Sequence, residues 1–113
     1  MRTNYIYARV ACKEQTDSRG AISWQINRCQ EHAYRLHLDT PVVESEQYSG
    51  NAIPPKLKQL LNSMNPGDRL IVDSPSRLSR DFSSFVQVKT DLAAKGCRLE
   101  FARNNLGVEL QPA

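Results

Sequence analysis

The chain has 113 residues, of which 40% are hydrophobic and 24% are charged. Its formal net charge is +3 and its pI is near 8.9, values that permit a polyanionic partner but do not require one. This length and composition predict one globular domain with a modest core and exclude a low-complexity or repeat protein. The apolar stretches fall short of the roughly 18 residues that a membrane span needs, and the N-terminus does not resemble a signal peptide.

The cysteines and histidines do not follow a disulfide or metal-binding pattern. Cys12, Cys29 and Cys97 are an odd number without a CxxC pair, which is typical of reduced thiols in a cytosolic protein. His32 and His37 are five residues apart, so they would leave a helix on different faces. We therefore expect no metal site in this domain.

Hydrophobic periodicity divides the chain into alternating strands and helices. Short β-branched or aromatic runs predict strands over residues 4–10, 40–45, 70–72 and 97–102. Apolar residues at helical spacing predict helices over residues 21–37 and 82–95, and a shorter helix marked by Leu57, Leu60, Leu61 and Met64. Polar loops and a strong turn separate these elements, at residues 12–20, 46–55 and 65–68.

The predicted helices have recognisable ends and inward faces. Asp81 is placed as an N-cap or first-turn acid, and Gly96 suits the position just after the last helical turn. The apolar face of the helix over residues 82–95 consists of Phe82, Phe85, Val88 and Leu92. That of the first helix consists of Ile22, Ile26, Cys29, Ala33 and Leu36, and two aromatic residues fall off this face, Trp24 and Tyr34. We expect Leu57, Leu60 and Phe85 to lie in the core.

The alternation predicts an α/β domain, with a three-layer, mainly parallel sheet of four to five strands and helices on both faces. Crossover connections should be right-handed. In open sheets of this kind, binding sites form at the carboxyl ends of strands, near the point where the strand order switches. The domain is predicted to span residues 1–103, and residues 104–113 form an irregular C-terminal tail without periodicity.

Three arginines fall where such a site would form. Arg9 closes the first apolar run, and Arg77 and Arg80 follow directly after the third predicted strand. Guanidinium groups stay charged and match phosphate oxygens bidentately, so this sheet edge predicts a site for a phosphate-sized anion. The alternative is that Arg77 and Arg80 only pair with their neighbours Asp73 and Asp81.

Four short sequence segments, taken together and in their order along the chain, indicate a protein family. They are Tyr7-Ala8-Arg9-Val10 followed by Lys13-Glu14-Gln15 and Gln25, then Glu46 before Ser49-Gly50, then residues 67–72, and finally Ser76-Arg77-Leu78-Ser79-Arg80-Asp81. Together they resemble the N-terminal catalytic domain of the serine recombinases, the resolvase/invertase family, including its large members. The resemblance covers about residues 4–103 and implies the fold of the resolvase catalytic domain.

The resemblance also implies a chemistry. In this family a serine hydroxyl attacks a DNA backbone phosphate, giving a 5′-phosphoserine link and a free 3′-hydroxyl, and strands are exchanged in a tetramer without a metal or other cofactor. The phosphate would be held, and its transition-state charge stabilised, by Arg9, Arg77 and Arg80. The supporting residues would be Gln15, Gln25, Ser76 and Glu46, of which the two glutamines would support the loop after the first strand.

Three positions depart from the family pattern. The serine expected directly after Arg-Val is Ala11 here, and because a methyl group cannot attack phosphorus we predict an inactive chain, whether the serine was replaced or the member is naturally silenced. The adjacent Cys12 should point elsewhere, and it would need a lowered pKa to act as a nucleophile. Ser76 stands where many members carry aspartate. Lys56 lies near a loop position that usually supplies another arginine, so it is either a phosphate contact or a solvated first-turn lysine.

The family follows this domain with a long dimerisation helix and a DNA-binding domain, and neither is present in the sequence. The resemblance therefore implies weak, salt-sensitive contacts with DNA phosphates, and self-association to a dimer or tetramer in the full-length protein. It implies a cytoplasmic, nucleoid-associated protein of a bacterium or phage, without a membrane partner. One alternative is a natural non-catalytic module that pairs with or regulates an active recombinase. Another, a flavodoxin-like phosphate binder, is disfavoured because no Gly-rich loop follows the first strand.

Overall fold

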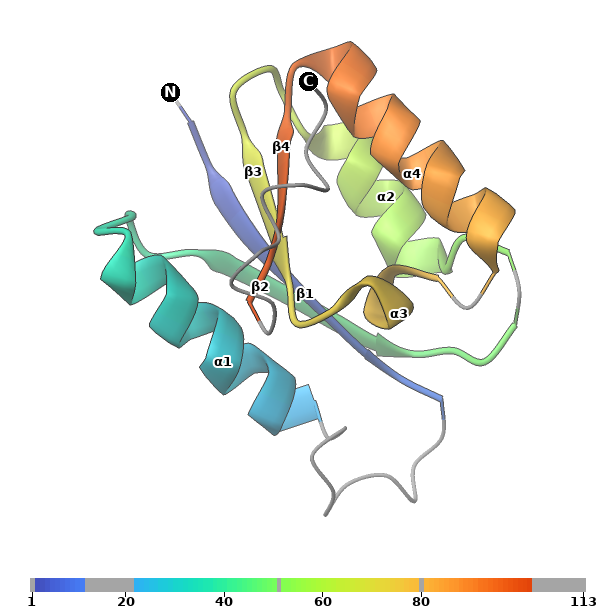
Figure 1. Ribbon diagram of the computed structural model, residues 1–113, viewed down its shortest axis with the longest axis horizontal. Helices are drawn as coiled ribbons and strands as arrows, with labels where there is room; N and C mark the ends of the chain where they lie inside the picture. Colours follow the sequence, from blue (N-terminus) through green and yellow to red (C-terminus); the bar gives the residue numbers. More distant parts are fainter. Residues whose placement is uncertain (1, 12–21, 51, 80, 103–113) are drawn as a thin grey trace.

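The computed structural model describes residues 2–11, 22–50, 52–79 and 81–102, which form an α/β domain (Figure 1). The elements in chain order are β1 (Asn4–Val10), α1 (Ile22–Arg35), β2 (Val42–Gln47), α2 (Pro55–Ser63), β3 (Arg69–Val72), α3 (Pro75–Leu78), α4 (Phe82–Lys95) and β4 (Arg98–Phe101). The predicted alternation of strands and helices is confirmed. Within the described part of the chain, none of the helices combines the length and the apolar character that crossing a membrane requires.

The four described strands form one parallel sheet in the order β2-β1-β3-β4. β1 lies inside this sheet, where Tyr7 pairs with Glu44 of β2 on one side and with Val72 of β3 on the other. The predicted parallel sheet is therefore confirmed, and its strand order reverses direction at β1. Because β1 and β3 are neighbours, their carboxyl ends lie at the same sheet edge, where the sequence predicts an anion site.

The sheet face covered by α2 and α4 carries the larger core (Figure 1). Alternate strand residues point to this face because successive side chains of a strand alternate. The buried members of this core are Tyr7, Leu57, Leu60, Leu61, Met64, Leu70, Val72, Leu78, Val88, Leu92, Cys97, Leu99 and Phe101. The predicted core positions of Leu57 and Leu60 are confirmed, and Phe85 is partly buried against the same cluster.

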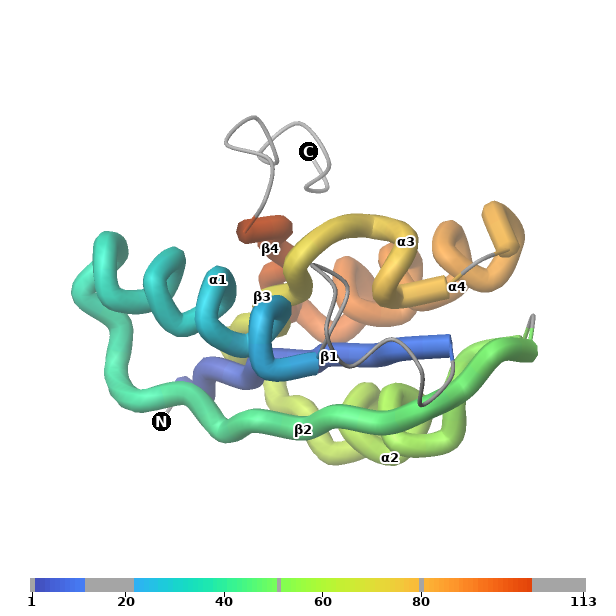
Figure 2. Tube along the Cα trace, turned by 90° about the horizontal axis from the view of Figure 1, so that it is seen from below, coloured from blue at the N-terminus to red at the C-terminus, as the bar shows by residue number. Residues whose placement is uncertain are grey.

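The opposite face is covered by α1, and Figure 2 shows α1 and α2 on opposite sides of the sheet. Cys29 and Ala33 of α1 pack with Ile6 of β1 and Ile71 of β3. The fully buried α1 side chains are small and the larger Ile26 is only partly buried, so α1 gains less from apolar burial than α2 and α4 do. Burial, with a smaller contribution from the charge of Asp73, raises the pKa of the Cys29 thiol to about 12, so this cysteine stays protonated at neutral pH.

The ends of α4 follow the capping rules that its sequence indicated. The Asp81 side chain accepts a hydrogen bond from the main-chain N–H of Ser84 and so caps the first turn. Gly96 follows the last turn with a φ of 78°, a left-handed conformation that costs glycine little. Both predicted helix ends are therefore confirmed.

Several sequence predictions differ from the structure in detail. The second strand lies at Val42–Gln47 and not at residues 40–45, because pairing with β1 begins only after Pro41, which has no N–H to donate. Leu36 is exposed because α1 ends one residue before it. Phe82 is 78% exposed, since it lies about 90° around α4 from the buried Val88 and Leu92.

Candidate active site

Four of the predicted site residues come from two segments at one edge of the sheet. Arg9 and Ala11 lie at the end of β1, and Ser76 and Arg77 lie in α3, directly after β3. The short helix α3 was not predicted, and it starts with Pro75 at its first position. Two other predicted site residues, Gln15 and Arg80, lie outside the described residues, as do Cys12 and residues 104–113.

The Arg9 side chain is buried, with 3% of its surface exposed, and it donates to three main-chain carbonyls. Nε bonds to the carbonyl of Arg77 at 3.0 Å, and one terminal nitrogen bonds to that of Ser76 at 2.7 Å. The other terminal nitrogen bonds to the carbonyl of Tyr48 at 2.7 Å, in the connection after β2. Arg9 therefore joins the end of β1 to α3 and to the loop that leads to Ser49-Gly50. Its side chain is a structural element of this edge.

Gln25, in the first turns of α1, binds the main chain of Arg9 from the other side. Its Oε1 accepts from the Arg9 N–H at 3.0 Å, and its Nε2 donates to the Arg9 carbonyl at 2.8 Å. The β1–β3 ladder ends where Tyr7 pairs with Val72, so the Gln25 amide bonds to β1 beyond the end of β3. The completely buried Gln25 side chain thus fixes the main chain that leads to Ala11.

Arg77 differs from Arg9 in how its guanidinium is satisfied. Its Nε is buried and has no hydrogen-bond partner among the residues that the structure describes. The predicted alternative partner Asp73 is bonded instead by Arg28, whose Nε lies 2.9 Å from Oδ1 of Asp73. A buried guanidinium N–H without a partner is costly unless a ligand or water bonds to it. The Arg77 side chain is therefore suited to receive an acceptor such as a phosphate oxygen.

The Ser76 side chain lies near the hydroxyl of Ser74. The two oxygen atoms are 3.2 Å apart, and either one can donate. Ser74 precedes α3, and its carbonyl accepts the N–H of Arg77 at 3.0 Å. These hydroxyls lie at the polar start of α3.

Glu46, at the end of β2, stabilises the start of α2. Its carboxylate accepts the main-chain N–H groups of Lys56 and Leu57 at 3.0 and 3.1 Å. The residue in the N-cap position of α2 is Pro54, whose side chain cannot accept these hydrogen bonds. Glu46 of β2 therefore accepts them instead. Glu46 was predicted to be a supporting residue, and this capping contact was not predicted. The sequence could have indicated such a contact, because α2 starts with two prolines and has no capping side chain of its own.

The same carboxylate binds a buried tyrosine of β1. The hydroxyl of Tyr7 donates to Oε2 of Glu46 at 2.5 Å. Burial, and secondarily the hydrogen bond and charge of Glu46, raise the pKa of Tyr7 well above its ordinary value, so its hydroxyl stays protonated. Glu46 therefore connects β1, β2 and α2, and it holds the two ends of the connection that contains Ser49-Gly50.

Lys56 lies in the first turn of α2 and forms a surface ion pair. Its Nζ is 3.6 Å from a carboxylate oxygen of Glu44, and both side chains are substantially exposed. An exposed pair of this kind contributes little to stability and is easily exchanged for another anion. A phosphate contact of Lys56 stays a prediction.

The chain is a parallel α/β domain that brings Arg9 and Arg77 to the carboxyl ends of two neighbouring strands. Residues 4–112 match the family model described as the resolvase N-terminal domain. The chain belongs to this family of site-specific serine recombinases, which act on DNA. The resemblance seen in the sequence is therefore confirmed. No curated protein matches the chain significantly.

Solved structures of catalytic domains share the fold. The N-terminal catalytic domain of TP901-1 integrase is 18% identical, with a TM-score of 0.78 over 96% of this chain and 89% of that chain. The C-terminal catalytic domain of IS1535 TnpA, an IS607-like serine recombinase, is 25% identical, with a TM-score of 0.69 over 88% and 70% of the two chains. A serine recombinase from Sulfolobus solfataricus is 22% identical, with a TM-score of 0.55 over 100% and 71%.

Proposed function

We propose that this chain is a serine recombinase catalytic domain that holds a DNA backbone phosphate but does not cleave the DNA. The observation that carries the proposal is the pairing of Ala11, in the position of the nucleophile, with a buried Arg77 Nε that lacks a partner among the described residues. The anion-binding part of the site is thus retained while the attacking group is missing.

The chemistry that Ala11 removes can be stated atom by atom. With serine at position 11, the serine oxygen would bond to phosphorus, the bond from phosphorus to the 3′-oxygen would break, and the serine proton would pass to that oxygen. Arg77 and Arg80 would stabilise the charge on the phosphate during this exchange. Arg9 would act mainly by holding the main chain of α3, because three of its N–H groups already bond to carbonyls.

The anion site can be tested on the chain with Ala11 in place. Titration with inorganic phosphate should shift the NMR signal of the Arg77 side-chain Nε–H, and Arg77→Lys should weaken the binding. Arg98→Gln is a matched control, since Arg98 lies at the start of β4, at the opposite end of the parallel strands from Arg77. Binding of a short DNA duplex should weaken steeply with salt, as expected for phosphate contacts. Equal phosphate binding by the parent and Arg77→Lys would disprove this site.

The missing nucleophile is tested by Ala11→Ser. Incubation of this variant, in its full gene context, with supercoiled target DNA should give a covalent protein–DNA adduct that protease treatment removes. Arg77→Lys in the same background should reduce the yield of adduct. An Ala11→Ser protein that binds DNA without forming any adduct would contradict the catalytic part of the proposal.

The second candidate function is a natural non-catalytic module that pairs with an active recombinase. Ala11 favours it as well, because an intact fold with a silent nucleophile position suits a regulatory partner. Sequencing the source gene across codon 11 separates the two. A serine codon supports an inactivated recombinase, whereas an alanine codon supports the module and predicts a complex with an active relative. Both versions place the protein in the cytoplasm, with DNA and other recombinase chains as partners.

A further inference from the structure

Three polar side chains of α1 reach three different strands of the sheet. Gln25 binds the main chain of β1, and Arg28 pairs with Asp73 at the end of β3. Nε2 of His32 lies 2.8 Å from Oε1 of Glu100 in β4. The three residues are three and four positions apart, so they share one side of the helix. We call Gln25, Arg28 and His32 the polar seam.

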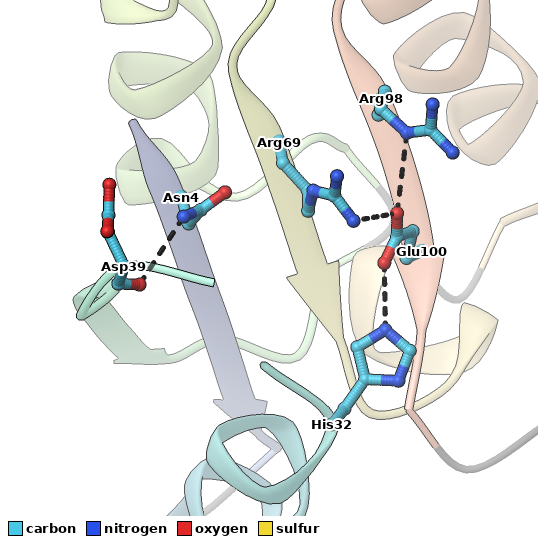
Figure 3. Close-up of polar contacts among 6 residues, drawn as sticks. All are labelled: Asn4, His32, Asp39, Arg69, Arg98 and Glu100. Atoms are coloured by element: carbon cyan, nitrogen blue, oxygen red, sulfur yellow. Dashed lines mark hydrogen bonds and ion pairs between the residues drawn. The ribbon is translucent and has the colours of Figure 1, made fainter. Parts of the chain in front are cut away.

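Glu100 is the fixed end of the third contact (Figure 3). Only 7% of this residue is exposed, and Oε2 lies 2.5 Å from a terminal nitrogen of Arg69 and 3.4 Å from Nε of Arg98. Burial would by itself raise the pKa of Glu100, but the hydrogen bond from His32 and the charge of Arg69 lower it below its ordinary value. Glu100 is therefore an anion held in place by β3 and β4.

The polar seam has a large part in setting the position of α1 because the apolar contact beneath the helix is small. The fully buried α1 members of the cluster there are Cys29 and Ala33, which interdigitate less than leucine or phenylalanine would, and the larger Ile26 packs against it only partly buried. A shallow apolar contact tolerates rotation of a helix about its axis, whereas directional hydrogen bonds do not. Gln25 and His32 are separated by about 10 Å along one rigid helix, so a rotation of α1 about its axis displaces both side chains.

We propose that His32 and Glu100 are positioning residues for the strand end at Ala11. Their contact fixes the rotation of α1, and α1 in turn holds the Gln25 amide on the main chain of Arg9. The role of this strand end in binding DNA phosphate rests on the proposed function. Its positioning by α1 is a property of the structure and does not depend on that function.

The test is amide hydrogen exchange by NMR, because the Arg9 N–H donates to Gln25. His32→Ala should speed exchange at Arg9 by about tenfold or more, through local opening, while slow amides of β3 and β4 change by less than about twofold. Trp24 gives a second signal, since it is the one tryptophan of the chain and stacks on Arg28 at 4.9 Å. Its emission should change in the same variant.

Two further variants make the test specific. His32→Gln keeps an N–H donor that can reach Glu100, so exchange at Arg9 should return to within about threefold of the parent rate. His37→Asn changes an exposed histidine just beyond α1, keeps a residue type that tolerates its left-handed φ of 56°, and should leave the Arg9 rate unchanged. If His32→Ala does not fold, His32→Phe keeps a ring of similar size, removes both ring nitrogens and should give the same pattern.

Two results would overturn the positioning role. One is an unchanged Arg9 exchange rate in His32→Ala and His32→Phe. The other is equal acceleration of all slow sheet amides, which would show a general loss of stability. Neither result depends on phosphate or DNA binding. A failure of the proposed anion site would therefore appear in the phosphate titration and not in the exchange rates.

Discussion

The two faces of the sheet hold their helices by different means. On one face, α2 and α4 are packed through large apolar side chains such as Leu57, Leu92 and Phe101. On the other face, α1 combines a small apolar contact with the polar seam. Apolar burial contributes much free energy but little direction, whereas hydrogen bonds contribute less net energy and more direction. One face of the sheet therefore mainly stabilises the domain, and the other mainly positions its site.

The largest expected effect is on the apolar face. Leu60→Ala should lower the free energy of unfolding by about 2–5 kcal/mol, because it removes a nearly fully buried side chain and leaves a cavity. Urea unfolding followed by circular dichroism measures this loss. Phe82→Ala is the matched control on the same side of the sheet, and its exposed ring predicts a change within about 0.5 kcal/mol. Equal losses in the two variants would contradict this view of the core.

A smaller effect is expected where the two kinds of stabilisation meet. Glu46→Ala should cost about 2–3 kcal/mol, since it removes the cap of α2 and leaves the buried Tyr7 hydroxyl without its acceptor. Glu46→Gln should cost less, because the amide oxygen can still accept. Thermal or urea unfolding of both variants checks the order. A glutamine variant as unstable as the alanine variant would show that charge, and not hydrogen bonding, is what matters at Glu46.

The smallest effect is expected on the polar face, and it depends on pH. The pKa of Glu100 is lowered in the folded protein, so its contribution to stability is present above the ordinary value of 4.5 and is lost as pH falls through the lowered value. The groups that face it are His32, Arg69 and Arg98. Urea unfolding from neutral pH to about pH 3 should show a shallower acid loss in Glu100→Gln than in the parent. Identical pH profiles would argue against a paired Glu100.

Much of the fold could be predicted because its signals are local. Strand runs, the Asp81 cap, the Gly96 turn and the core positions of Leu57 and Leu60 all follow from residue type and spacing. Phe82 shows the limit of this reasoning. Its spacing from Phe85 fits a helical face, yet it is exposed because it lies about 90° around α4 from the buried Val88 and Leu92.

The site was predicted only in part, because its contacts to main-chain atoms leave no pattern in the sequence. The sequence predicted that Arg9, Ser76 and Arg77 lie at one edge of the sheet, because the carboxyl ends of neighbouring parallel strands lie together. It did not show that Arg9 donates to three carbonyls or that Glu46 caps α2. Main-chain carbonyls have no sequence signature, so a buried arginine that binds them looks the same as one that binds a ligand.

The strand order has a consequence for how the protein is made. β1 is synthesised first but lies inside the sheet, and its partner β3 leaves the ribosome much later; the bond between Thr3 and Asp68 joins residues 65 positions apart. A parallel sheet has no hairpin that could form early, so its pairing is non-local and slow. The apolar β1 therefore lacks its β3 partner until the whole connection between the two strands has been translated. Nascent chains that stop before β3 are expected to need chaperones, whatever the stability of the finished domain.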